Sequence, residues 1–268
     1  MSDTKLQNLV KDSGMVTHLR AVDCLREHGW SVNIGTYYYD NVADAVREID
    51  VVAEKRFESA TRGRSSVELN VQLFIECKYL NNEVLFWSEG INRNKALEKV
   101  EQMTGLRIVE VRHSGDILPD KFHYLENRQQ KVAKLFSTNS NKEDVIYKAV
   151  SQCLRAQVYH EQWVREPIAI PFNDHAEVQT KIVRYPIAVL SSFDTVYEAL
   201  INTKTAEYST VPVTRPFLLE TNYVYLNNSK SVARDDYILI DMVSLDTLGN
   251  WLVSLDAEAG AIVAATIK

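Results

Sequence analysis

The sequence predicts an α/β protein in which helices flank a mixed β-sheet. Residues 67–78 alternate between apolar and polar side chains, which is typical of a strand with one buried face. Residues 17–28 and 92–104 carry apolar side chains at helical spacing, and Gly105 follows the second segment, where a helix commonly ends. Strands that alternate with helices are typical of α/β folds, in which a crossover helix joins parallel neighbours.

The composition is that of a compact globular protein. Of the 268 residues, 46% are hydrophobic and 25% charged, and only nine are Gly and six Pro, so the chain can bury a sizeable core. This length fits one large domain or two small ones. We divide the chain into residues 1–136 and an α/β carboxy-terminal region of unknown role, residues 142–268, joined by the polar run 137–141. The two regions can also belong to one domain.

Charge and cysteine content argue against several classes of protein. The net charge of −6 disfavours a broad basic surface that coats nucleic acid without selectivity. Cys24, Cys77 and Cys153 are widely spaced and odd in number, so we expect a reducing cytoplasm. The amino terminus is polar and no apolar run approaches the ~20 residues that cross a membrane, so we expect a cytoplasmic protein with no membrane partner.

Two predicted strands bring two carboxylates and a lysine together. In the strand 67–78, Glu76 and Lys78 project from one face, because side chains two positions apart do so. A second strand, residues 47–53, carries Asp50, and a polar turn separates the two strands. Antiparallel pairing of these strands is expected to bring Asp50 beside Glu76.

This arrangement resembles the PD-(D/E)xK nuclease superfamily, which has the restriction-endonuclease-like fold. The family core runs in the order helix, strand, Asp-bearing strand and Glu-x-Lys strand, an order filled here by residues 17–28, residues 31–34, Asp50 and Glu76-Cys77-Lys78. The resemblance covers roughly residues 15 to 112. The proline that often precedes the Asp is absent, at a position that varies in the family. The resemblance implies a restriction-endonuclease-like core within residues 1–136.

The resemblance also implies metal-dependent hydrolysis of phosphodiester bonds, with Asp50, Glu76 and Lys78 as catalytic residues. Mg²⁺ (or Mn²⁺) would be bound by Asp50, Glu76 and the backbone carbonyl of Cys77, since Mg²⁺ prefers oxygen ligands and takes one or two protein carboxylates. Lys78 would orient or deprotonate the attacking water. Many relatives add a Glu from the first helix; here His18 is the polar residue on the apolar stripe of that helix, and it is either a further metal ligand or a core histidine.

The function expected from this resemblance is cleavage of nucleic acid, foremost as a DNA endonuclease of restriction or host-defence type. The choice between DNA and RNA is left open, and a homodimer or a partner protein is compatible with the family. The alternative is a catalytically inactive nuclease-fold binding or assembly module, in which the same three side chains form a structural ion-pair network. Phosphoryl transfer from ATP has no support, because the sequence contains no G-x-x-x-x-G-K-[ST] loop and no G-x-G-x-x-G turn.

The pattern after these strands predicts further helices and one more core strand. Residues 106–111 are strongly apolar, and we expect them to be the strand that completes the nuclease core after the crossover helix. Residues 121–136 and 142–163 have the apolar spacing of two further helices.

Two later stretches resemble each other. Residues 185–196 and 237–248 each contain an apolar strand followed by Ser-x-Asp-Thr. Because Ser and Asp side chains accept hydrogen bonds from the first turn of a helix, we expect a helix after each motif. Residues 217–226 between them are typical of a strand.

Overall fold

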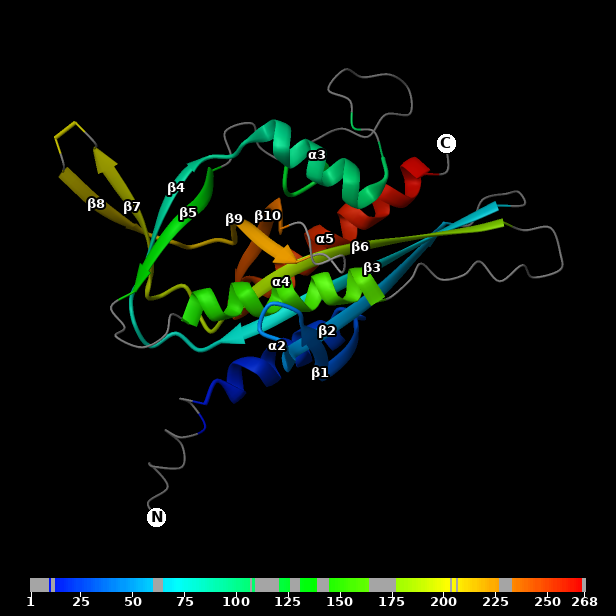
Figure 1. The fold of residues 1–268 in the computed structure, drawn as a ribbon, viewed down its shortest axis with the longest axis horizontal. Helices are drawn as coiled ribbons and strands as arrows, with labels where there is room; N and C mark the ends of the chain where they lie inside the picture. Colours follow the sequence, from blue (N-terminus) through cyan, green and yellow to red (C-terminus); the bar gives the residue numbers. More distant parts are fainter. Residues whose placement is uncertain are drawn as a thin grey trace, which may run out of the picture.

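The chain forms a ten-stranded mixed sheet with helices on both faces in the computed structural model (Figure 1). The structure describes residues 13–59, 65–106, 121–125, 131–138, 145–163, 177–202, 207–226 and 233–266, together with Val10, Ile108, Lys204 and Thr205. The elements are α2 (Met15–Glu27), β1 (Ser31–Asp40), β2 (Ala45–Ser59), β3 (Ser65–Lys78), β4 (Val84–Gly90), α3 (Arg93–Thr104), β5 (Lys131–Thr138), α4 (Val145–Trp163), β6 (Glu177–Leu190), β7 (Val196–Asn202), β8 (Glu207–Pro212), β9 (Phe217–Leu226), β10 (Ala233–Ser244) and α5 (Leu245–Thr266).

The strands lie in the order β1-β2-β3-β6-β10-β9-β5-β4-β7-β8. β1, β2 and β3 form an antiparallel meander, β6 lies parallel to β3, and β10 lies parallel to β6. The elements of this part of the sheet follow one another along the chain as α2, β1, β2, β3, α4 and β6. In the sequence, β4, α3 and β5 come between β3 and α4. Because β3 and β6 are neighbours, residues 1–136 and 142–268 both contribute to one sheet.

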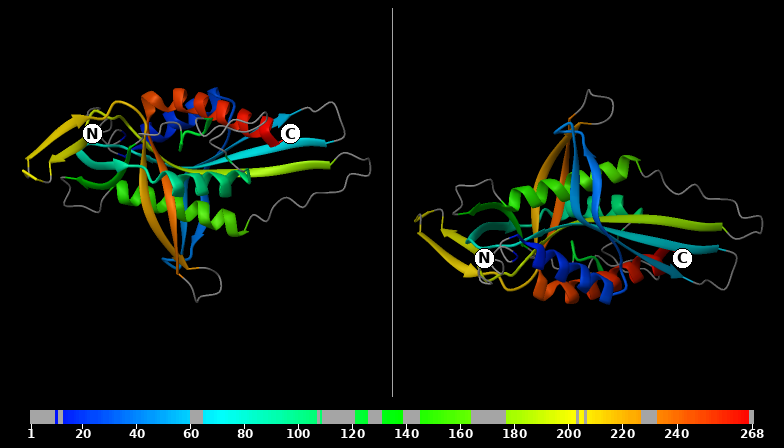
Figure 2. Two further views of the ribbon diagram at one scale, coloured as in Figure 1. Left: turned by 90° about the horizontal axis from the view of Figure 1, so that it is seen from above. Right: turned by 90° about the horizontal axis from the view of Figure 1, so that it is seen from below.

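Two hydrophobic cores lie on opposite faces of the sheet. α4 covers one face, where Ala149 and Cys153 belong to the same core as Phe74 of β3. α2 and α5 cover the other face, opposite α4 (Figure 2), and α3 contributes Ala96 and Val100 to the core on that face. β3 is therefore buried on both faces, and Gln72 and Glu76, which the alternation of the sequence places on the polar face, are buried as well. None of the helices in the described part of the chain has the length and apolar character needed to cross a membrane.

The helix predicted over residues 92–104 is confirmed, together with its ends. The Asn92 side chain accepts a hydrogen bond from the Lys95 amide at 3.2 Å, which satisfies a free donor of the first turn of α3. Gly105 follows the helix with φ of 64°, the left-handed conformation that glycine adopts without steric strain.

The helix predicted over residues 121–136 is wrong in its described part. Residues 131–138 form β5, which pairs with β4 and β9. The apolar residues of this stretch fit a helical period in sequence, but pairing with two neighbouring strands outweighs a weak local preference. Ser137 and Thr138, expected in a linker, pair with Leu85 and Val84.

The predicted position of residues 106–111 beside β3 is also wrong. β2 and β6 occupy the two sides of β3, so the parallel neighbour of β3 is β6. Most of residues 106–111 lie outside the described residues. The sequence pattern identified a buried apolar segment correctly at Ile108, which is 5% exposed, but it could not identify the partner strand.

Only the second Ser-x-Asp-Thr motif begins a helix. There, Thr247 Oγ1 accepts a hydrogen bond from the Ser244 amide at 3.2 Å at the start of α5. After the first motif, Ser192 Oγ accepts from the Asp194 amide at 3.3 Å, and the chain continues as β7 instead of the expected helix. β7 pairs with β4 and β8, and this pairing overrides the local capping signal.

Candidate active site

Asp50 and Glu76 meet where β2 and β3 run side by side near the carboxyl end of β3. Val51 pairs with Ile75, so the register of this antiparallel pair places Asp50 opposite Glu76. The Cys77 amide donates a hydrogen bond to Asp50 Oδ2 at 2.8 Å, and the Asp50 amide donates to Glu76 Oε1 at 3.3 Å. The antiparallel pairing predicted from the sequence is thus confirmed.

Lys78 completes the group. Its Nζ lies 2.6 Å from Glu76 Oε2 and 4.0 Å from Asp50 Oδ2. The lysine therefore bridges both carboxylates, one from each strand. The structure brings together all three side chains that the sequence marks as catalytic candidates.

A glycine in β1 shapes the strand pair beside Asp50. Ile34 pairs with Val51 and Thr36 with Ile49, so Gly35 lies opposite Asp50. Its φ is +65°, and a Cβ at this position would lie 2.9 Å from Glu48 Oε1. Sequence reasoning missed this residue, although an isolated glycine within a strand pattern is a known signal of a local backbone irregularity.

The electrostatics of Glu76 are unusual for a carboxylate that contacts a lysine. Its side chain is fully buried, and this loss of solvation raises the pKa of Glu76 to about 7, an effect only partly opposed by Lys78. Desolvation lowers the pKa of Lys78, but attraction to Glu76 and Asp50 outweighs it, so the pKa of Lys78 is raised. Lys78 is accordingly positively charged at neutral pH.

Asp50 is the open member of the group. Its side chain is 32% exposed, and Oδ1 accepts no hydrogen bond from the part of the chain that the structure describes. A carboxylate oxygen has capacity for up to two hydrogen bonds or a metal bond. Asp50 Oδ1 is therefore the atom through which this group can reach a ligand from solvent.

The cover over Glu76 comes from α4. The Cys153 thiol is buried, and its pKa is raised first by desolvation and then by the charge of Glu76, which places α4 close to that carboxylate. The sequence predicted α4 as a helix. It carried no signal that this helix would lie over the carboxylates.

His18 does not join the two carboxylates. No group of three or more His, Cys, Asp or Glu side chains among the described residues is arranged to hold a metal ion, so His18 forms no such set with Asp50 and Glu76. Its Nε2 is buried and has no hydrogen-bond partner in the described part of the chain. His18 lies half-buried on α2, and nothing in the described part of the chain supports the metal-ligand interpretation.

The oxygen donors at the site suit a hard divalent cation. Asp50 and Glu76 supply carboxylate oxygens, and the hydrogen bond from the Cys77 amide fixes Asp50 beside the residue whose carbonyl the resemblance implicates. Two protein carboxylates are enough for Mg²⁺, which keeps several waters or substrate phosphates. Comparisons of the chain with protein-family models, with curated proteins and with solved structures found no match. The case for a function rests on the geometry of these side chains.

Proposed function

We propose that the chain is a metal-dependent nuclease that hydrolyses phosphodiester bonds, foremost as a DNA endonuclease of restriction or host-defence type. One observation carries the proposal: Asp50, Glu76 and Lys78 come from two adjacent strands and converge within 4.0 Å. Hydrolysis of a phosphodiester requires oxygen ligands for a cation and a positive group near the attacking water, and these three side chains supply both.

The order of the elements supports a restriction-endonuclease-like core. α2, β1, the Asp-bearing β2 and the Glu-x-Lys strand β3 follow one another in the order that the family uses. α4 and β6 then supply a helix and a strand parallel to β3. In this proposal β4, α3 and β5 are an insertion, which explains why the fourth core strand comes far later in the sequence than residues 106–111.

Asp50, Glu76 and the Cys77 carbonyl would hold Mg²⁺ or Mn²⁺. When bound there, the cation supplies charge stabilisation for the phosphate and a more acidic water. Asp50 offers Oδ1, which accepts no hydrogen bond from the described residues, and Glu76 can offer Oε1, which accepts the Asp50 amide at 3.3 Å, or share Oε2 with Lys78. The desolvation that raises the pKa of Glu76 also makes a positive charge at this position strongly favourable.

Lys78 orients the attacking water and the phosphate oxygens in this proposal. As a protonated amine it donates hydrogen bonds and offsets negative charge, but it cannot accept a proton from water in the state described here. The orienting role is therefore better supported than deprotonation by Lys78.

Cleavage of supercoiled plasmid, single-stranded DNA and RNA tests the proposal, each with Mg²⁺, with Mn²⁺ and with chelator. We expect metal-dependent cutting by the wild type and at least a ~100-fold loss in Asp50→Asn and Lys78→Met, as for removal of a group that stabilises the transition state. The substrate that is cut decides between DNA and RNA. Direct linearisation of plasmid, as opposed to nicking alone, indicates two cooperating sites.

Glu68→Gln is the matched control. Glu68 lies on the same strand as Glu76, forms an ion pair with Arg56 at 3.6 Å, and is eight positions away, or about 26 Å along the strand. It should cut at the wild-type rate. Activity that survives in Asp50→Asn contradicts the assignment, and absence of cutting and of metal-dependent stabilisation in every form supports the alternative, a nuclease-fold binding or assembly module.

A further inference from the structure

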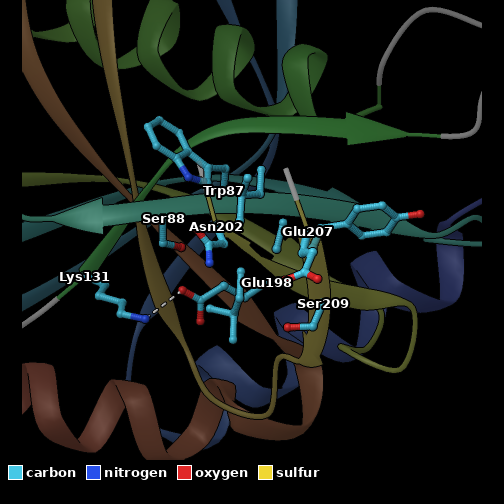
Figure 3. Close-up of a pocket in the computed structure, with 11 residues that line it drawn as sticks. Trp87, Ser88, Lys131, Glu198, Asn202, Glu207 and Ser209 are labelled. Atoms are coloured by element: carbon cyan, nitrogen blue, oxygen red, sulfur yellow. Dashed lines mark hydrogen bonds and ion pairs between the residues drawn. The ribbon is translucent and has the colours of Figure 1, made fainter. Parts of the chain in front are cut away.

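A cavity of about 1010 Å³ lies between β4, β5, β9, β10 and the first half of α5. The ion pair of Lys131 with Glu198, at 3.2 Å, separates it from a shallower depression of about 620 Å³ beside the β7–β8 hairpin (Figure 3). Small-molecule sites in proteins have volumes of roughly 300–1000 Å³. The cavity is large enough for a ligand, and it contains none of the three candidate nuclease residues.

The wall of the cavity combines aromatic rings with a half-buried histidine and a buried carboxylate. Phe86 and Phe217 pack edge to face with ring centroids 4.8 Å apart, and the Trp251 ring forms another part of the wall. His123 and Asp241 also line the cavity, with side chains that are 17% and 3% exposed. A mostly apolar cavity with a few convergent polar groups is typical of a binding site.

His123 lies between two carboxylates. Its Nδ1 is 2.6 Å from Glu258 Oε2, and its Nε2 is 3.2 Å from Asp241 Oδ2. Both ring nitrogens face carboxylate oxygens, so both must carry a proton and the ring is an imidazolium. In agreement, the two carboxylates outweigh desolvation and raise the pKa of His123 well above its usual range.

The cluster of His123, Asp241 and Glu258 retains one negative charge. Two carboxylates and one imidazolium leave this excess, which faces the cavity through Asp241. Arg215 also lines the cavity, but its side chain is exposed, so water screens its charge.

Asp241 retains capacity for one more donor. Its Oδ2 accepts hydrogen bonds from Tyr124 Oη and His123, both at 3.2 Å. Among the described residues, its Oδ1 accepts a single hydrogen bond, from Trp251 Nε1 at 3.2 Å. A carboxylate oxygen can accept two, so Oδ1 can receive a further N–H from a ligand in the cavity.

We propose that this cavity binds a planar aromatic cation or aromatic amine, which donates an N–H to Asp241 Oδ1 and stacks on the aromatic wall. The negative charge selects a cation over an anion, and the Trp251 and Phe217 rings favour a cation further through their negative faces. A purely apolar molecule would leave the Oδ1 capacity unused. This site is independent of the phosphodiester chemistry.

Three probes of one shape test the charge preference: benzamidine, benzamide and benzoate, which are cationic, neutral and anionic. Binding to the full chain is measured by ligand-observed NMR and by calorimetry. We expect benzamidine to bind at least ~10-fold more tightly than benzamide, and benzoate to bind most weakly. Equal binding of the three, or the reverse order, overturns the proposal.

Two variants on α5 test the location. Ser254 lines the cavity, whereas its neighbour Val253 does not and is 57% exposed. Ser254→Trp should fill the space and abolish benzamidine binding, and Val253→Trp should leave it unchanged. Asp241→Asn, if circular dichroism shows that it is folded, should reduce the preference for benzamidine over benzamide by at least ~10-fold. Benzamidine binding that persists in Ser254→Trp excludes this cavity as the site.

Discussion

The molecule contains two charged clusters of the same formal composition, two carboxylates and one cation, on opposite faces of the sheet. The open cluster is Asp50, Glu76 and Lys78; the closed cluster is Asp241, Glu258 and His123. They are also close through the sheet. Asp241 pairs with Ile187, and Ile187 pairs with Ile75, the residue before Glu76. Because neighbouring strands lie about 4.8 Å apart, the backbone at Asp241 is about 10 Å from the backbone at Ile75.

The two clusters differ in the number of donors around each buried carboxylate. Glu258, 5% exposed, accepts hydrogen bonds from His123 Nδ1, from the His123 amide and from Tyr185 Oη at 2.6 Å. Desolvation alone would raise its pKa, but attraction to the charge of His123, together with these hydrogen bonds, outweighs desolvation, so the pKa of Glu258 is lowered. Glu76 has two donors in the part of the chain that the structure describes, Lys78 and, at a longer distance, the Asp50 amide, and its pKa rises to about 7. Burial alone therefore does not set the charge state; the charges and hydrogen-bond donors around each carboxylate decide it as well.

We expect the largest loss of stability when Glu258, the carboxylate of the closed cluster with the most hydrogen-bond donors, is replaced by a neutral side chain. Glu258→Gln removes one of the two carboxylates that pair with protonated His123, and its new amide N–H faces either the imidazolium or the Tyr185 hydroxyl. We expect a loss of about 3–5 kcal/mol in the free energy of unfolding, the usual effect of breaking a buried ion pair. Urea denaturation followed by circular dichroism measures it.

Glu68→Gln is the control for the closed cluster, because Glu68 is part of a more exposed ion pair with Arg56. It should change stability by less than about 1 kcal/mol. If Glu258→Gln changes stability as little as the control does, the closed cluster does not stabilise the fold.

The open cluster was largely predictable from the sequence, whereas the closed cluster was not. Asp50, Glu76 and Lys78 lie on two strands that follow one another in the sequence, so the side-chain period of two and antiparallel pairing suffice to bring them together. His123 lies in a turn. Asp241, in a strand, and Glu258, in a helix, follow it 118 and 135 positions later in the chain. No local pattern specifies such contacts.

The same limit explains the errors in the fold. β1 to β3 are adjacent in sequence and in the sheet, and their predicted order is confirmed. β5 pairs with β4 and β9, and β7 pairs with β4 as well as with the adjacent β8, so each has a neighbour far away along the chain; β5 and β7 were the segments predicted as helices. Apolar spacing identified segments that become buried, but in these strands tertiary pairing decided the secondary structure.

The second prediction concerns the pH dependence of stability that Glu76 causes. An unfolded Glu has its ordinary pKa of 4.5, whereas the folded value is about 7. Between these values the folded chain binds a proton that the unfolded chain has released, so raising the pH lowers stability. The loss should reach about 3 kcal/mol above pH 7.

Comparison with Glu76→Gln isolates this contribution, because other groups titrate similarly in both proteins. Urea titrations without metal measure the free energy of unfolding of both proteins. From pH 5 to pH 8 the wild type should lose stability relative to Glu76→Gln. A difference that stays constant over this range shows that Glu76 keeps an ordinary pKa and removes the contrast with Glu258.

The third prediction links metal binding at the open cluster to the same proton. A divalent cation requires the carboxylate form of Glu76, so each binding event below pH 7 releases a proton. The apparent affinity for Mg²⁺, measured from the rise in melting temperature, should fall by about tenfold per pH unit below pH 7 and level off above it. Asp50→Asn should show no Mg²⁺-dependent rise at any pH, and Glu68→Gln should behave as the wild type does.

The smallest effect expected is that of Gly35→Ala, which tests whether the backbone shape of β1 keeps the open cluster in place. Gly35 has φ of +65°, and an alanine Cβ would lie 2.9 Å from Glu48 Oε1. The left-handed conformation costs about 1–2 kcal/mol for a residue with a Cβ, and this is the expected loss of stability. Gly90→Ala is the control, because a Cβ there meets no atom within 4 Å.

Gly35 lies opposite Asp50, so relaxation of the strain should move that carboxylate and weaken Mg²⁺-dependent stabilisation as well. A loss of stability with unchanged Mg²⁺ dependence would mean that the hydrogen bond from Cys77 alone fixes Asp50.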